Sequence, residues 1–284
     1  MIELPSAGLT GCFGLGVAGN FAGHLEQAGE AGDFARVDAP AEAPKGIFPW
    51  YLPGDSGFLG AFPLSPDRIE LPQSDDRLDL QIEPEAGVLF AVDYSGGTAQ
   101  RIAPLALAAF NDCSIRREGA KKISEKKNWG ACSKGLAARA FEISELDPGG
   151  ATASLRLASF LRRGDSCHAY GIDSALPGYS YYGEMLTDWI VERLQNQTGG
   201  DTPLEAVGEQ LAGCGSPARI LVGIGATRYT QFGETHFLAP GDESVVVVYD
   251  SNVSAPEVVE AAVASHGEDQ LEEASVLVQA VRTR

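Results

Sequence analysis

The chain alternates apolar and polar residues over positions 151–162, and this two-residue period predicts a β-strand. In residues 182–195 the apolar positions instead recur at helical spacing, at Leu186, Trp189, Ile190 and Leu194. The same reading predicts further strands at residues 219–224, 245–249 and 274–281, and further helices at residues 19–31, 204–211 and 256–265.

Residues 78–94 predict a pair of strands that ends in a turn at Ser95-Gly96-Gly97. The apolar run 102–110 that follows is compatible with a buried strand or a helix, because its periodicity does not decide between them. The elements do not follow the regular βαβ alternation of a doubly wound sheet. We therefore expect an α+β fold that is mostly β, with mixed sheets and peripheral helices, in a single domain covering residues 1–284.

The composition of the chain limits the kinds of molecule that we expect it to bind. The chain has 284 residues, 34 of them glycine, and a formal net charge of -18. Such a surface repels nucleic acid and anionic membranes, whose binding needs clustered Lys and Arg. The one basic cluster, residues 116–127, is interpreted as a solvated loop. Five cysteines without CxxC spacing and the lack of a secretory signal or membrane-length apolar run lead us to expect a cytoplasmic protein with a small-molecule substrate.

Carboxylates gather in one part of the sequence. Glu83 and Glu85 lie two residues apart in a predicted strand and so share one face, and Asp112 ends the apolar run. A cation between such side chains turns repulsion into attraction, and oxygen-only ligands suit Mg²⁺ or Mn²⁺, with Ca²⁺ as a third candidate. The alternatives are a solvent-facing strand edge for the two glutamates and an Asx turn for Asn111-Asp112.

Several short motifs follow one another in a known order. Asn111-Asp112-Cys113-Ser114-Ile115-Arg116 after Glu-x-Glu resembles the fumarylacetoacetate hydrolase family. In the same order come residues 19–24, 44–48, 129–134, 183–185 and 237–242, where Phe-Leu-Ala-Pro-Gly-Asp matches a turn of that family. The resemblance covers roughly residues 12–250.

Some positions depart from the family pattern. Pro84 separates the two glutamates, and proline cannot donate to a ladder, so the strand is expected to be an edge or bulged there. Trp50 takes a lysine position, and the Gly-Thr-Pro turn is reduced to Gly225-Ala226-Thr227. Residues from about 253 onward form a divergent C-terminal extension.

The resemblance implies a homodimeric enzyme with a mixed β-roll that acts on 2-oxo acids or acylpyruvates by C–C hydrolysis, decarboxylation or enolisation. It implies that Glu83, Glu85 and Asp112 bind the metal and that His24 is the general base. Lys134 would stabilise the oxyanion, and Arg116 and Thr227 would bind substrate. Where hydrolytic relatives have a glutamate three residues after the histidine, this chain has Gln27, which predicts weak hydrolysis relative to enolisation or decarboxylation.

Two other functions compete with this one. The departures around the site are compatible with a non-catalytic metabolite-binding protein on the same fold. Gly14-x-Gly16-x-x-Gly19, followed by Asp38, fits the dinucleotide fingerprint of a nicotinamide-dependent oxidoreductase, although regular βαβ units do not follow. Gly54-Asp55-Ser56-Gly57 resembles a serine-protease loop but is interpreted as a turn.

Overall fold

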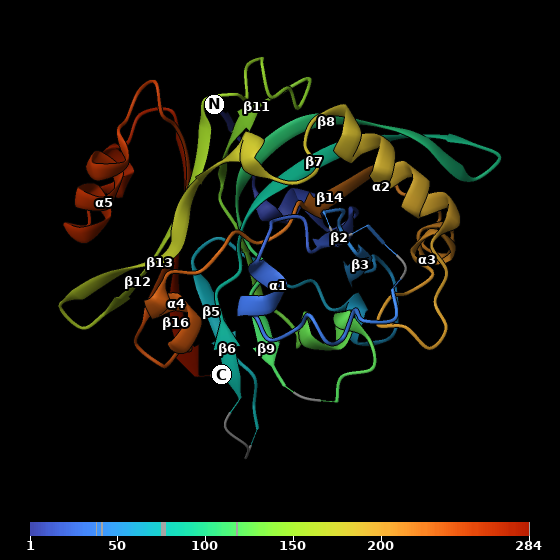
Figure 1. The fold of residues 1–284 in the computed structure, drawn as a ribbon, viewed down its shortest axis with the longest axis horizontal. Coiled ribbons are helices and arrows are strands. Elements are labelled where there is room, and N and C mark those ends of the chain that lie inside the picture. Colours follow the sequence, from blue (N-terminus) through green and yellow to red (C-terminus); the bar gives the residue numbers. More distant parts are fainter. Residues whose placement is uncertain (38, 41, 75–77, 118, 284) are drawn as a thin grey trace.

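The computed structural model describes all residues except 38, 41, 75–77, 118 and 284. Two large β-sheets enclose the main apolar core, and helices lie at the periphery (Figure 1). The mostly β fold with mixed sheets that the sequence predicts is confirmed.

The larger sheet has nine strands in the order β1-β11-β8-β7-β14-β2-β3, and β10 joins β8 to β4. It mixes parallel and antiparallel pairs, since β14 runs parallel to β2 and antiparallel to β7. Its strands are β1 (Ile2–Glu3), β2 (Phe13–Ala18), β3 (Gly46–Tyr51), β4 (Leu64–Ser65), β7 (Pro84–Ser95), β8 (Thr98–Asn111), β10 (Lys134–Leu136), β11 (Arg139–Glu142) and β14 (Arg219–Gly223).

The second sheet has five strands in the order β13-β12-β15-β16-β5. Side chains of β15 alternate between two cores, because Val246 and Val248 face the main core while Val245 and Val247 pack with α5 (Pro256–Ala264). The strands are β5 (Arg68–Leu71), β12 (Leu155–Arg163), β13 (Ser166–Ala175), β15 (Glu243–Asp250) and β16 (Ala274–Thr283), and a separate pair joins β6 (Asp79–Gln81) to β9 (Ser114–Arg116).

The helices are short and peripheral. In α2 (Glu184–Asn196) the buried residues Leu186, Ile190 and Leu194 form the stripe that the sequence predicted, and the helix lies against β8. The other helices are α1 (His24–Gln27), α3 (Val207–Gly213), α4 (Gln231–Thr235) and the 3-10 turns η1 (Ser6–Leu9), η2 (Phe58–Gly60), η3 (Ile123–Lys126), η4 (Leu176–Gly178) and η5 (Glu268–Gln270). Among the described residues, no helix is both long and apolar enough to cross a membrane.

The hairpin β7–β8 is the frame of the candidate site. Gly96 and Gly97 both have positive φ, as a tight hairpin turn requires, and they join the two longest strands. The ambiguous run 102–110 is therefore a strand. Pro84 is the first residue of β7 and lies beyond the end of the β14 ladder, which stops at Gly87, so no missing N–H interrupts that ladder.

The sequence did not predict β2, β13 or most of the short strands. Gly14 and Gly16 give β2 a low strand propensity, yet a Cβ at these positions would lie 2.5 Å from the Trp50 ring and 2.2 Å from the Phe48 ring. The glycines thus make room for aromatic side chains of β3. Residues from 253 onward form α5 and β16, and β16 is an inner strand of the second sheet.

Candidate metal centre and active site

Three carboxylates converge where β7 begins and β8 ends. The backbone N–H of Asp112 donates to Glu83 O at 3.0 Å, and Glu83 N–H donates to Asn111 Oδ1 at 3.2 Å. These bonds join the two strand ends, and Glu85 projects from β7 on the same side as Glu83. One carboxylate oxygen from each of Glu83, Glu85 and Asp112 lies within 4.8 Å of the others.

All three carboxylates are buried, and Asp112 has no exposed surface. This excludes a solvent-facing strand edge for Glu83 and Glu85. Burying three negative charges side by side is costly unless cations compensate them. The site must therefore contain positive charge.

Two lysines supply part of that charge. Lys127 Nζ lies 2.5 Å from Glu83 Oε2 and 2.6 Å from Asp112 Oδ2, so it bridges two of the three carboxylates. Lys134 Nζ contacts the other oxygen of Asp112 and lies 3.5 Å from the Cys113 carbonyl. Lys134 was predicted from the sequence, whereas Lys127 was not.

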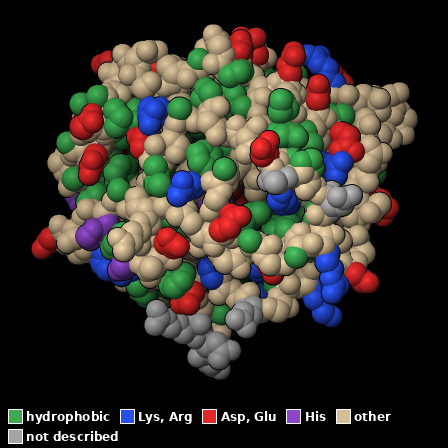
Figure 2. All heavy atoms as spheres, viewed as in Figure 1, with side chains coloured by type: hydrophobic (Ala, Val, Ile, Leu, Met, Phe, Trp, Pro, Cys, Tyr) green, Lys and Arg blue, Asp and Glu red, His purple; other side chains and the backbone are tan. Residues whose placement is uncertain are grey.

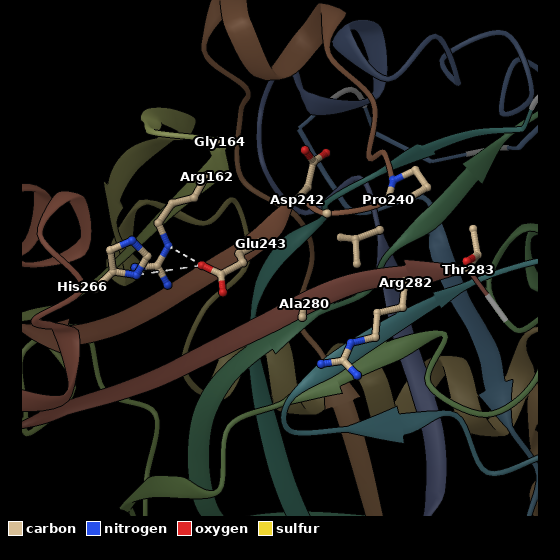
Figure 3. Close-up of a pocket in the computed structure, with 11 residues that line it drawn as sticks. Arg162, Gly164, Pro240, Asp242, Glu243, His266, Ala280, Arg282 and Thr283 are labelled. Carbon is tan, nitrogen blue, oxygen red and sulfur yellow. Dashed lines mark ion pairs between the residues drawn. The ribbon is translucent and has the colours of Figure 1, made fainter.

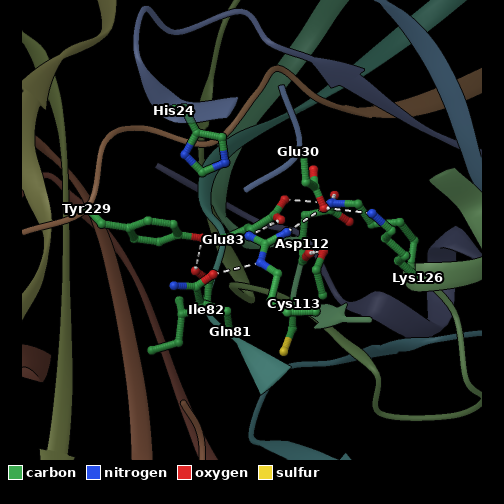
Figure 4. Close-up of polar contacts among 12 residues, drawn as sticks. His24, Glu30, Gln81, Ile82, Glu83, Asp112, Cys113, Lys126 and Tyr229 are labelled. Atoms are coloured by element: carbon green, nitrogen blue, oxygen red, sulfur yellow. Dashed lines mark hydrogen bonds and ion pairs between the residues drawn. The ribbon is translucent and has the colours of Figure 1, made fainter. Parts of the chain in front are cut away.

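Arg116 forms an ion pair with Glu83, which Figure 4 shows in one cluster with Glu30, Gln81 and Tyr229. Its NH2 lies 2.6 Å from Glu83 Oε1, an ion-pair distance without hydrogen-bond geometry. The remaining donors bond to Gln81 Oε1 at 2.6 Å, Glu30 Oε1 at 2.8 Å and the Tyr229 hydroxyl at 2.9 Å. Every guanidinium nitrogen thus has a protein partner. Arg116 therefore positions the carboxylates of Glu83 and Glu30.

The interpretation of residues 116–127 as a solvated loop is wrong for the three basic residues that contact the site, Arg116, Lys126 and Lys127. Lys126 and Lys127 are buried, and the Arg116 side chain is 10% exposed. Lys126 pairs with Glu30 and Asp33. A signal was available in the sequence, because buried carboxylates need counter-charges and this stretch is the chain's one basic cluster.

The charges shift one another's protonation. Burial alone would raise the pKa of Glu83, but the Lys127 ammonium and the Arg116 guanidinium hold it well below its usual range. Burial and the neighbouring Asp112 raise the pKa of Glu85 well above its ordinary value. Of the three carboxylates, Glu85 is thus the one whose negative charge lacks compensation, and a bound cation would supply it.

His24 begins α1 and is buried beside these groups. Its Nδ1 lies 2.9 Å from Thr227 O, and since a carbonyl oxygen only accepts, Nδ1 carries the proton. The lone pair is then on Nε2. Burial lowers the pKa of His24, although Glu83 opposes this shift, so the ring is neutral and can accept a proton.

Gln27 does not orient His24. Its side-chain amide donates to Tyr229 O at 3.2 Å and accepts from Tyr229 N at 2.9 Å. The carboxylates that act on His24 are Glu83 and, more weakly, Glu30, which both oppose the lowering of its pKa by burial and line the same small cavity. Gln27 therefore fixes the backbone of Tyr229 rather than the His24 ring.

A cavity of about 20 Å³ lies among these side chains. Its lining includes His24, Glu30, Glu83, Glu85 and Lys127, so these five groups face one space large enough for about one water molecule. Thr227 is buried nearby, and its hydroxyl has no hydrogen-bond partner among the described residues. A second hollow shares Glu30, Phe34 and Ile123 with this one and is also lined by Lys122 and Pro203.

The residues fit a divalent ion. The donor set is oxygen-only, and the uncompensated Glu85 is held in place by the Gly225 N–H, which donates to its Oε2 at 3.0 Å. A Cβ at Gly223 would lie 2.3 Å from that same oxygen, so the glycine leaves room for the carboxylate. The structure thus brings together Glu83, Glu85, Asp112, His24, Lys134, Arg116 and Thr227, the full set named from the sequence.

The competing motifs have structural explanations. Gly14 and Gly16 lie inside β2 under aromatic rings and not in a turn between a strand and a helix, which removes the context of a dinucleotide site. Asp38 lies outside the described residues. Asp55 Oδ2 accepts from Gly57 N at 2.7 Å, which confirms a turn at residues 54–57.

Larger hollows lie away from this chemistry. One hollow of about 640 Å³ is lined by residues including Arg162, Glu243 and His266. Arg162 is ion-paired there with Glu243 (Figure 3). It also forms an ion pair with Glu268. On the face shown in Figure 2, the basic side chains of the described residues are scattered among acidic and apolar ones. We assign no function to these features.

The fold places three buried carboxylates where they could hold a metal ion. Comparison with known families then assigns the chain to one of them. It belongs to a family of unknown function (DUF5718), which it matches over residues 30–281. A search of curated proteins finds no match.

Among solved structures, the chain is similar to Cg1458 with inhibitor, at 11% identity and a TM-score of 0.55 over 99% of this chain and 78% of that one. A second Cg1458 structure gives 12% identity and a TM-score of 0.50 over 99% and 77%. A 5-carboxymethyl-2-hydroxymuconate delta-isomerase from Mycobacterium smegmatis gives 13% and 0.49 over 96% and 77%. At 11–12% identity, the likeness to the Cg1458 structures shows a shared fold, in agreement with the mixed β fold that the sequence predicted.

Proposed function

We propose that this protein is a divalent-metal-dependent enzyme that acts on a 2-oxo acid or acylpyruvate-like small molecule. The observation that carries the proposal is the convergence of three buried carboxylates, Glu83, Glu85 and Asp112, within 4.8 Å. Mg²⁺ or Mn²⁺ suits this oxygen-only set, with Ca²⁺ as a third candidate, and water or substrate oxygens would complete the coordination of each. When bound, the ion would act as a Lewis acid toward the oxygens of a 2-oxo carboxylate.

The chain's own residues supply the proton transfer and part of the charge. His24, neutral and with its lone pair on Nε2, is the candidate base. Lys127 lines the cavity and would meet an anionic substrate oxygen, whereas Lys134 has no exposed surface and is held against Asp112. We therefore transfer the oxyanion role from Lys134 to Lys127, with Lys134 as the residue that positions Asp112.

Substrate recognition falls to Thr227 in this proposal. Its buried hydroxyl has no hydrogen-bond partner in the part of the chain that the structure describes, and a hydroxyl can donate to a substrate carboxylate. Arg116 is fully engaged by protein groups and so acts through Glu83 and Glu30. A cavity of about 20 Å³ is too small for an acylpyruvate, so the two segments that carry Phe34 and Ile123, which line both hollows, would have to move to admit one.

A rate comparison tests this proposal. Acylpyruvate cleavage, oxaloacetate decarboxylation and keto–enol exchange are measured with Mg²⁺ or Mn²⁺, and again with a chelator. We expect metal-dependent turnover that is lost in Glu83→Gln and His24→Asn and retained in the exposed control Asp93→Asn. A turnover rate that is unchanged both by the chelator and by Glu83→Gln would refute the proposal.

One observation favours a second candidate, a non-catalytic protein that binds a metabolite on the same fold. The cavity is nearly closed, and two of the three carboxylates are already neutralised by lysine and arginine. Oxalate, which resembles an enolate, would then raise the thermal stability of the metal-loaded protein while the three assays show no turnover.

A further inference from the structure

Lys127 occupies an unusual position for a residue beside a metal site. Its ammonium bridges Glu83 Oε2 and Asp112 Oδ2 at 2.5 and 2.6 Å, and the side chain is only 3% exposed. No other lysine among the described residues contacts two of the three candidate ligands. Lys134 contacts Asp112 alone.

An ion on the same two carboxylates would lie close to this ammonium. Mg²⁺ binds oxygen at about 2.1 Å, so an ion on Glu83 Oε2 would lie at most about 4.6 Å from Lys127 Nζ, the sum of 2.1 and 2.5 Å. Two positive charges at that distance repel each other strongly where water is excluded. Both could remain only if further negative charge were present.

The count of charges shows that only one negative charge is spare. The site and its immediate ion pairs hold five carboxylates, Glu30, Asp33, Glu83, Glu85 and Asp112, and four cations, Arg116, Lys126, Lys127 and Lys134. With all nine ionised the net charge is -1, and a divalent ion would change it to +1 in a largely buried space. One of the cations that contact the candidate ligands must withdraw when the ion enters, to restore neutrality.

Lys127 is the cation able to withdraw. Arg116 is fixed by bonds to Gln81, Glu30 and Tyr229, and Lys134 has no exposed surface. Lys127 instead lines the small cavity that it shares with Glu30, which offers another carboxylate for the ammonium.

We propose that the Lys127 ammonium and the divalent ion are alternative occupants of the Glu83–Asp112 carboxylate pair, so that the ion binds only when Lys127 withdraws. This inference rests on the metal site proposed above. It makes Lys127 an internal competitor that weakens metal binding and stabilises the metal-free protein.

The test is Mn²⁺ titration by calorimetry on wild type, Lys127→Met and the matched control Lys134→Met. We expect Lys127→Met to bind Mn²⁺ roughly tenfold or more tightly than wild type, a gain of about 1.4 kcal/mol, and Lys134→Met to show no such gain. Equal or weaker binding in Lys127→Met, with clear binding in wild type, would overturn the inference and leave the metal site intact. Absence of binding in both folded proteins would overturn the metal site itself.

Thermal unfolding covers the case in which Lys127→Met does not fold without metal. Mn²⁺ should then restore folding, because the ion replaces the missing ammonium between Glu83 and Asp112. A variant that stays unfolded at all Mn²⁺ concentrations would contradict the exchange of one cation for the other.

Discussion

Asp112→Asn removes one negative charge from the centre of the site without changing the size of the side chain. Both oxygens of Asp112 contact ammonium groups, Lys127 on Oδ2 and Lys134 on Oδ1. Lys127 keeps the carboxylate of Glu83 as a partner in this variant, but Lys134 is left with neutral acceptors, namely the new amide oxygen and the Cys113 carbonyl at 3.5 Å. The variant therefore leaves a fully buried ammonium without its counter-ion.

The expected cost follows from that burial. Removing one partner of a buried ion pair typically destabilises a protein by about 3–5 kcal/mol, because the remaining charge is left uncompensated. Replacing Lys134 by methionine as well removes this stranded charge. The double variant Asp112→Asn/Lys134→Met should thus be more stable than Asp112→Asn alone, with a coupling free energy of about 2 kcal/mol between the two positions.

Urea unfolding of wild type, both single variants and the double variant, all in chelator, measures this coupling. Asp93→Asn is the control, since Asp93 pairs with Arg101 at 3.8 Å with both side chains mostly exposed, and it should cause no measurable change. If the effects of Asp112→Asn and Lys134→Met add to within about 0.5 kcal/mol, the two groups are not coupled and the charge arrangement described here is incorrect.

Three further predictions concern other parts of the structure. Gly223→Ala should weaken Mn²⁺ binding, because its Cβ would lie 2.3 Å from Glu85 Oε2, whereas Gly213→Ala, with nothing within 4 Å, should bind as wild type does in calorimetry. Burial raises the pKa of Glu205 to about 7, so the folded state holds this proton more tightly than the unfolded state, and the free energy of unfolding should fall as pH rises from about 4.5 through 7, by roughly 3 kcal/mol. Urea titrations should show that Glu205→Gln removes that slope and that Glu209→Gln does not, and an unchanged slope in Glu205→Gln would contradict the assignment. We also predict a homodimer, and a monomer mass by light scattering at micromolar concentration would count against it.

Long strands were predictable where burial imposes a pattern. Residues 245–249 were recognised as a strand, and the structure adds that the valines divide between two cores. The run 102–110 remained ambiguous because its own periodicity does not show that it pairs with β7. β2 was missed because its glycines serve the rings of Phe48 and Trp50, a tertiary contact that local propensity does not contain.

The candidate site was also predictable only in part, where a local pattern placed its residues. Alternation placed Glu83 and Glu85 on one face, and the position of Asp112 after an apolar run placed it at a strand end. Lys127 and Glu30 were not assigned roles, because they reach the site from irregular segments whose path depends on the whole fold. The partner of Gln27 could not be predicted for a related reason, since the Tyr229 backbone is 202 positions away in sequence, and the weak hydrolysis expected from the lack of a glutamate at position 27 stays a prediction.

The most direct test of the central claim is a crystal structure of the protein soaked with Mn²⁺ and oxalate, with the ion located by its anomalous scattering. The account predicts one anomalous peak bound by Glu83, Glu85 and Asp112, with the Lys127 ammonium moved away from the Glu83–Asp112 pair. No peak among these carboxylates, with Lys127 still bridging Glu83 and Asp112, would contradict it.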